Sequence, residues 1–432
     1  MVWIREVLRS RFIRNVAVVA TGTAGAQVIT MLFSPMVTRI YGPEAFGLLG
    51  TFIAILAVLT PMAAMSYPIA IVLPKRDVEA LMVAKLSLVI SAMVFLLVFF
   101  VIIVWGDLLV VLLGADVVKD YLWLVPIAML FSALHQICEQ YVIRQRKFRA
   151  AARVALIQSI ALNTAKTGAG MIYPAAMVLV LMQAINSGVH AFLLWFSVRR
   201  NFPVRNWCGP ETGINLRSLS YKYRDFAFYR APEGVINAAS QSLPILMLAA
   251  LFGPASAGFY TLGRTVMGMP AALIGKSVGD VFYPRISEAA NKGEELYPLV
   301  RNATLALAAV GVLPFLIVII FGPSLFSFVF GDDWAEAGDY ARWLAIWMFF
   351  MFINNPSIKV IPVIRVQGFQ LAYTLLSLVL RACVLYFAYY CYRDDQLAVS
   401  LFSVLGAILN IGLIAIVFVK CAYYDRAGVV DG

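Results

Sequence analysis

Twelve apolar runs, separated by short polar or Gly/Pro breaks, fill almost the whole chain. Each run is long enough to form a membrane-spanning helix, which needs about 20 apolar residues. In lipid, a helix is favoured because it satisfies its own backbone hydrogen bonds. The pattern therefore predicts an all-α polytopic membrane protein with about twelve transmembrane helices. The runs lie near residues 15–40, 44–73, 80–105, 121–143, 153–171, 173–198, 231–251, 255–281, 297–322, 338–361, 367–391 and 396–422.

The composition excludes a soluble fold. Of the 432 residues, 62% are hydrophobic and only 13% are charged, and the mean hydropathy is +0.86. Soluble domains are roughly 45–50% apolar and about 25% charged. A soluble chain of this size could not hide so much apolar surface from water.

The basic residues indicate how the chain is oriented. The net charge is +11, and 27 of the 34 Lys and Arg residues fall on one side if the N-terminus is cytoplasmic. Cytoplasmic loops carry the basic excess in membrane proteins, so both termini are predicted to be cytoplasmic. We interpret the basic N-terminus as a retained pre-helix rather than a signal peptide. The basic loops favour contact with anionic membrane lipids, and their placement argues against a nucleic-acid partner.

Internal similarity divides the chain into two halves. Tyr41–Gly47 recurs as Phe252–Gly258, and Leu113–Asp116 recurs as Phe330–Asp333. Matches in the same order predict two six-helix lobes in parallel orientation, and such repeat transporters bind substrate between their repeats. The predicted parts are an N-terminal lobe, a basic cytoplasmic linker and a C-terminal lobe, at residues 1–198, 199–230 and 231–432.

Soluble catalytic signatures are absent from the sequence. It contains no phosphate-binding P-loop, no HExxH and no GxSxG motif. The five cysteines are scattered without a CxxC pair, which favours neither a metal site nor a disulfide framework. We therefore predict a transporter rather than an enzyme, without a metal or a cofactor.

Cations within the spans are the main candidates for substrate binding, since each costs about 2.5–3.5 kcal/mol or more at the centre of a helix. Arg264 is interpreted as a cavity-facing anion ligand in preference to a side chain that snorkels to the headgroups. Arg381 lies near the middle of its span and is expected to face a cavity or a partner. Lys166 is either a cavity ligand or part of a wet helix end, and Arg39 is either a ligand or an interface anchor.

Two pairs of residues at positions i and i+4 are candidates for ion coupling. His135 and Glu139 form one pair, and Lys276 and Asp280 form the other. Residues at this spacing share one face of a helix. Glu139 could carry a coupling proton or cation, or its carboxylate could pair with Arg144 and Arg146 at the inner rim. Asp280 could act in coupling, or it could simply pair with Lys276.

Three motifs carry a resemblance to a known family. They are Gly42-Pro43 to Gly47, Arg144-Gln-Arg-Lys-Phe148 and Phe330-Gly-Asp-Asp-Trp334. With these motifs, the chain resembles polysaccharide and O-antigen flippases of the multidrug/oligosaccharidyl-lipid/polysaccharide exporter superfamily over nearly its whole length. The stretch Tyr260-x3-Arg264-x5-Pro270 is also similar to a span of lipid II flippases. That resemblance places Arg264 in a cationic cavity.

The resemblance implies alternating access by two lobes in a bacterial inner membrane. Its implied substrate is an undecaprenyl diphosphate-linked oligosaccharide, a repeat unit of O-antigen or exopolysaccharide. A polysaccharide polymerase and chain-length proteins are the partners it suggests. Two alternatives stay open: a drug or organic-cation exporter of the same superfamily, and a membrane glycosyltransferase or polymerase. The first would favour an acid-lined cavity, and the second would need catalytic carboxylates on sizeable outer loops.

Overall fold

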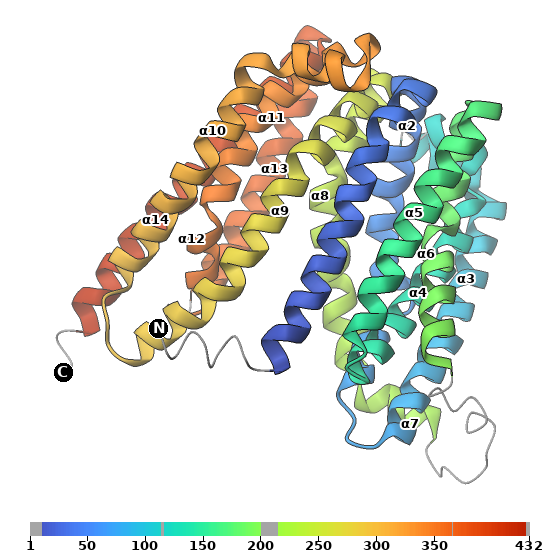
Figure 1. The fold of residues 1–432 in the computed structure, drawn as a ribbon, viewed down its shortest axis with the longest axis horizontal. Coiled ribbons are helices and arrows are strands. Elements are labelled where there is room, and N and C mark those ends of the chain that lie inside the picture. Colours follow the sequence, from blue (N-terminus) through green and yellow to red (C-terminus); the bar gives the residue numbers. More distant parts are fainter. Residues whose placement is uncertain (1–10, 114–115, 200–214, 365, 429–432) are drawn as a thin grey trace. The chain divides into compact units, whose positions relative to one another are not determined.

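The computed structural model describes residues 11–113, 116–199, 215–364 and 366–428, and these residues form helices and turns without a β-strand. The chain folds into two compact units, Met1–Ala257 and Gly258–Gly432. Figure 1 shows the helices in sequence colours. The predicted all-α membrane fold is confirmed.

The first unit is built around a long helix, α2, which lies between α5 and α8 (Figure 1). Helix α4 packs on α3 and α6, and α5 packs on α6. Small polar side chains join α2 to α5, because Ser159 Oγ donates to the Ala26 carbonyl oxygen at 2.8 Å. The helices of this unit are α2 Arg11–Ala63, α3 Asp77–Leu113, α4 Leu124–Arg144, α5 Phe148–Ile172, α6 Ala176–Val198, α7 Leu216–Lys222 and α8 Ala231–Phe252, with short helical turns at η1 Tyr67–Val72, η2 Asp116–Tyr121 and η6 Phe226–Arg230.

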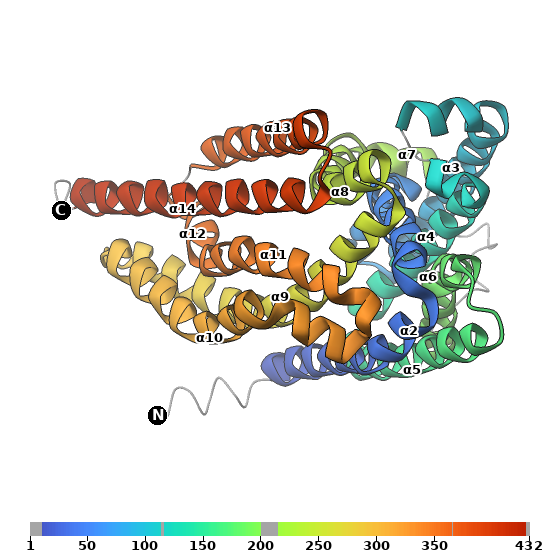
Figure 2. The ribbon, with the colours of Figure 1, turned by 90° about the horizontal axis from the view of Figure 1, so that it is seen from above.

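The second unit contains most of α9 together with the helices that follow it. Helix α11 lies between α10 and α14, and α13 packs on α14 (Figure 2). The α11 contacts bury aromatic rings, among them Trp334, Tyr340 and Phe352. The helices are α9 Pro254–Asn291, α10 Leu296–Phe330, α11 Ala335–Ile353, α12 Asn355–Val360, α13 Gln367–Tyr392 and α14 Asp395–Gly428, with η7 Asp332–Trp334.

Each expected span coincides with a helix or with part of one. The first two spans are joined in α2, which bends at Gly42, and seven of the described helices are long and apolar enough to cross a membrane. The run expected at 44–73 is shorter as a helix, because α2 ends at Ala63 and η1 begins at Tyr67. Between them, Met65 and Ser66 have positive φ angles, which end the regular helix.

The repeated motif has the same backbone geometry in both copies. Gly42 has φ 70° and ψ 173°, and Gly253 has φ 100° and ψ 176°. Glycine adopts positive φ without steric cost, and the proline that follows each glycine fits the first turn of a helix. The shared geometry agrees with an internal repeat. The lobe boundaries at 198 and 231 stay a prediction, since the compact units divide at Ala257 and place α8 in the first.

The described part of the predicted linker is attached to the first unit. Lys222 Nζ on α7 lies 2.5 Å from the Glu79 carboxylate at the start of α3, and the Tyr223 hydroxyl donates to the same carboxylate at 3.1 Å. The hydrogen bond to Glu79 raises the pKa of Lys222. The Tyr67 hydroxyl also donates to the Ser220 carbonyl oxygen at 3.1 Å. These contacts dock α7 against α3 and η1.

Candidate functional site

The second unit brings two of the predicted cations together. Arg264 is on α9 and Arg381 is on α13, and their charges interact with each other and with Tyr260. Tyr260 precedes Arg264 by one helical turn and is fully buried. Two like charges repel, so their proximity creates a positive potential that favours an anion. We call Arg264, Arg381 and Tyr260 the arginine site.

Aromatic rings hold Arg381 in place. Its guanidinium carbon lies 4.9 Å from the ring centroid of Trp347 on α11 and 5.5 Å from that of Phe402 on α14. The two rings meet edge to face, with centroids 5.2 Å apart. Such cation–π contacts are worth about 0.5–2 kcal/mol, which is less than the cost of placing a guanidinium inside a span.

Within the described chain, the charge of Arg381 has no acidic partner. The groups that interact with it electrostatically are Tyr260, Tyr373 and Arg264, none of which carries a negative charge. Tyr373 donates its hydroxyl to the Leu409 carbonyl oxygen instead. Arg381 therefore contributes a positive charge to the arginine site that no described carboxylate offsets.

Sequence reasoning did not identify Trp347 and Phe402. An aromatic residue inside a span is common, and no local motif marks these two. For Tyr260, the third aromatic residue of the site, the sequence does offer a signal: it stands four residues before Arg264, and residues at this spacing share one face of a helix.

The other two predicted cations belong to the first unit. Lys166 on α5 is partly buried and has no ion-pair partner among the described residues. Its carbonyl oxygen accepts a hydrogen bond of 2.7 Å from the Tyr41 hydroxyl. Arg39, two residues before Tyr41 on α2, has an exposed side chain. Their roles in substrate binding stay predictions.

A polar seam runs between α4 and α6. The rings of His135 and His190 lie with centroids 4.3 Å apart, and Ser132 Oγ donates to Ser187 Oγ at 3.3 Å. Glu139 interacts electrostatically with His190, although its side chain is exposed. The seam thus joins the expected His135–Glu139 pair to a second histidine, which the sequence separates from it by about 50 residues.

At the C-terminal end of α4, Arg144 forms an ion pair with a carboxylate other than Glu139. Arg144 pairs with Asp77, with Nη2 and Oδ1 2.8 Å apart. It also donates to the Ile71 and Pro74 carbonyl oxygens at 3.2 and 2.6 Å. Arg144 therefore contacts Asp77 and backbone carbonyl oxygens, and it does not form the expected ion pair with Glu139. The other expected pair, Lys276 and Asp280, lies on α9, but its side chains are outside the described part of the structure.

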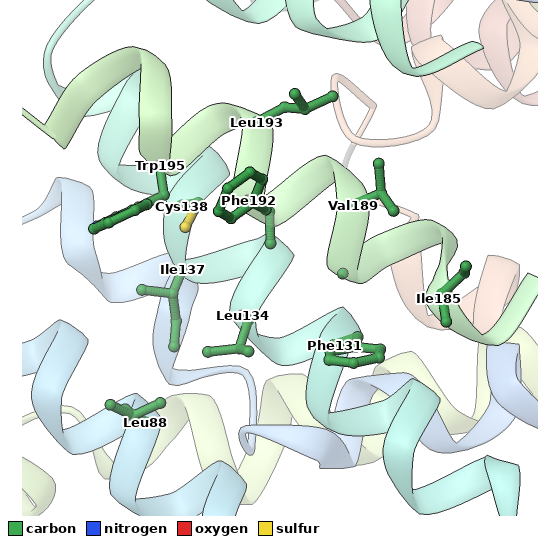
Figure 3. Close-up of a pocket in the computed structure, with 12 residues that line it drawn as sticks. Leu88, Phe131, Leu134, Ile137, Cys138, Ile185, Val189, Phe192, Leu193 and Trp195 are labelled. Carbon is green, nitrogen blue, oxygen red and sulfur yellow. The ribbon is translucent and has the colours of Figure 1, made fainter. Parts of the chain in front are cut away.

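An apolar groove of about 660 Å³ opens on the first unit (Figure 3). Small residues of α6 and α4 make the hollow, and bulky rings flank it. Gly188 is essential to this shape, because a Cβ there would meet the Phe131 ring at 2.9 Å. The groove can accept hydrocarbon but has no charged group to bind a head group. It is lined by Leu88, Phe131, Leu134, Ile137, Cys138, Ile185, Gly188, Val189, Ala191, Phe192, Leu193 and Trp195.

Comparison with known families identifies the class of protein. Residues 36–339 match the family described as polysaccharide biosynthesis protein. Because this match covers more than half of the chain, the chain belongs to that family. The membership confirms the resemblance to polysaccharide-type flippases found from the sequence motifs.

Two relatives from Escherichia coli K12 share parts of the sequence. The inner membrane protein YghQ is 33% identical over 107 residues, which cover 24% of this chain and 29% of YghQ. The lipopolysaccharide biosynthesis protein WzxC is 24% identical over 187 residues, which cover 43% of this chain and 36% of WzxC. The chain therefore matches about a third of the length of each relative.

Solved structures share the fold at low sequence identity. The lipid II flippase MurJ in an inward closed conformation aligns with a TM-score of 0.70 at 12% identity, covering 95% of this chain and 90% of that protein. An inward-facing MATE family transporter of the MOP superfamily aligns with a TM-score of 0.67 at 13% identity, covering 93% of this chain and 95% of that one. These neighbours are transporters, in agreement with the prediction that this chain is not an enzyme.

Proposed function

We propose that this protein moves a lipid-linked oligosaccharide, joined to its lipid by a diphosphate, across a bacterial inner membrane. The observation that carries the proposal is the arginine site, where Arg264 and Arg381 interact without an acidic counter-charge near Arg381 in the described chain. A diphosphate crossing about 30 Å of hydrocarbon needs cations held away from lipid. Membership of a polysaccharide biosynthesis family, and the similarity to the lipopolysaccharide biosynthesis protein WzxC, support a role in polysaccharide biosynthesis.

The substrate is further proposed to be an undecaprenyl diphosphate-linked repeat unit of O-antigen or exopolysaccharide. Such a molecule is strongly amphiphilic. The arginine site in the second unit offers cations for its diphosphate. Transport is proposed to use alternating access of two lobes with both termini cytoplasmic. A polysaccharide polymerase and chain-length proteins are the proposed partners.

Drug export is the second candidate, since the MATE neighbour is a multidrug transporter. An organic cation would be repelled by the arginine site, because like charges within a low-dielectric interior destabilise each other. The chemistry of Arg264 and Arg381 therefore favours an anionic substrate. Ion coupling is proposed to involve Glu139 and His135 in the α4–α6 seam, with Asp280 as a further candidate.

Replacement of Arg264 tests the proposal. In cells that lack the native gene, Arg264→Ala should abolish export of the glycan while the protein still inserts at normal levels. Arg264→Lys should retain part of the export, because a point charge can hold phosphate without bidentate geometry. Glycan export would be followed by surface labelling, and membrane levels by immunoblot. Full export by the Ala variant at native level would contradict the proposed role of Arg264.

A further inference from the structure

One buried hydrogen-bond donor belongs to the guanidinium of Arg381, and two others belong to residues on α11 and α14, the helices whose aromatic rings stack on it. Arg381 Nε, Trp347 Nε1 and Ser403 Oγ each have no hydrogen-bond partner among the described residues. Trp347 is 6% exposed and Ser403 is completely buried. Buried polar groups are rarely left without a partner, so each such group requires an explanation.

The residues that carry these donors are on α13, α11 and α14, and packing contacts connect them one after another. The Arg381 guanidinium stacks over the Trp347 ring. The pyrrole edge of that ring faces Gly406 on α14, because a Cβ at Gly406 would stand 2.9 Å from Trp347 Nε1. Ser403 precedes Gly406 by three residues and therefore shares its face of α14. Glycine at position 406 gives the indole room to approach this face.

The chemistry of the donors selects an acceptor. An indole N–H and a guanidinium N–H can only donate, and a serine hydroxyl can donate as well. A ligand that satisfies all three must present several acceptor oxygens, and the charge of Arg381 favours negative ones. A phosphate or diphosphate group has this character, whereas an organic cation does not.

We infer that Trp347 and Ser403, together with Arg381, form a binding site for the oxygens of the substrate diphosphate. This inference rests on the proposed function and adds two ligand residues to it. Trp347 has two roles in this site: its ring holds the guanidinium, and its N–H binds an oxygen. Arg381 is partly exposed as a residue, whereas the three donor atoms are buried, so in this site α11, α13 and α14 must separate before an anion can bind them.

The test measures binding of inorganic pyrophosphate to the purified full-length protein by calorimetry. Trp347→Phe keeps an aromatic ring for Arg381 but removes the N–H, and Ser403→Ala removes the hydroxyl. Each variant should weaken pyrophosphate binding about tenfold, as expected for loss of one hydrogen bond to a charged group. Trp347→Leu removes the ring as well and should weaken binding further. Thermal melting of each variant establishes that it is folded.

Two neighbouring positions provide matched controls. Trp343 lies one turn before Trp347 on α11 and is 36% exposed, so Trp343→Phe should bind pyrophosphate like the wild type. Ser400 lies one turn before Ser403 on α14 and already donates to the Leu397 carbonyl oxygen at 2.8 Å, so Ser400→Ala should also have no effect.

Two results would overturn the inference: wild-type affinity in both Trp347→Phe and Ser403→Ala, or no pyrophosphate binding by the wild-type protein. If Trp347→Phe binds pyrophosphate like the wild type and only Trp347→Leu binds it more weakly, the indole N–H is not a ligand and the inference is wrong for that group. Glycan export separates this inference from the proposed function. Export that depends on Arg264 but is normal in both variants would leave the function standing and refute the site. Pyrophosphate binding that depends on both residues, without glycan export by the wild type, would support the site and refute the function.

Discussion

A side chain at Gly47 would collide with the backbone at Pro254, since an ideal Cβ on Gly47 would stand 1.7 Å from the Pro254 carbonyl oxygen. Gly47 ends the first copy of the repeated motif, and Pro254 belongs to the second copy. The two copies therefore touch each other within the first unit, where α2 packs on the chain that follows α8. Close backbone approach is the physical reason for glycine at this position.

Gly47→Ala should therefore destabilise the protein. A rigid backbone carbonyl cannot move aside as a flexible side chain can, so we expect a loss of at least about 1–3 kcal/mol, typical of overpacking. Thermal unfolding in detergent and the amount of protein in the membrane would measure it. Gly168→Ala on α5 is the control, because a Cβ there meets no atom within 4 Å. Equal stability of the two variants would contradict the packing seen at Gly47.

Arg144 should matter more for stability than its acidic partner. Arg144→Ala leaves the Ile71 and Pro74 carbonyl oxygens without their donor, at a cost of about 1–3 kcal/mol. Asp77 has a side chain that is 87% exposed, and exposed ion pairs contribute only about 0–1 kcal/mol. Asp77→Asn should consequently lower the melting temperature less than Arg144→Ala. The reverse order would show that the ion pair, and not the carbonyl contacts, holds the segment between η1 and α3.

The α4–α6 seam gives a prediction about coupling. If Glu139 carries a coupling proton beside His135 and His190, Glu139→Gln should make transport in proteoliposomes insensitive to an imposed pH gradient. A glutamine has nearly the same shape but does not titrate. Glu233→Gln is a control in the same unit, since Glu233 forms an exposed pair with Arg230, its atoms 2.8 Å apart. A gradient response in Glu139→Gln equal to that of the wild type would exclude Glu139 as the coupling group.

The orientation predicted from basic residues can be tested with reporter fusions. A fusion after Gly432 should report the cytoplasmic side, and a fusion within residues 331–340 should report the opposite side. The physical reason is the excess of Lys and Arg in the loops assigned to the cytoplasm. Alkaline phosphatase and fluorescent reporters, which are active on opposite sides, would make the measurement. The twelve-span topology places an odd number of spans between the two fusion sites. If both sites report the same side, that number is even and the topology is wrong.

Local features of the chain are enough to predict that it lies in a lipid bilayer, where its helices are and where its main bends occur. The length of an apolar run is a local property, and it predicts helices that the structure contains from α2 to α14. Gly42-Pro43 and Gly253-Pro254 also act locally, because glycine permits positive φ and proline starts the next helix. The same short motifs indicate the family. The four cations stand out as unusual in the sequence, since the cost of a charge inside a span depends on its position in that span.

The packing of the helices establishes which of these residues meet. The sequence presents Arg264, Arg381, Lys166 and Arg39 as one set of candidate cations, yet the fold joins Arg264 to Arg381 and leaves the other two in the first unit. In the same way, Trp347 lies beside Arg381, His190 beside His135, and Asp77 beside Arg144. Each pairing depends on how whole helices rotate and pack against each other. That arrangement is set by many weak contacts between segments far apart in the chain, so no local pattern encodes it.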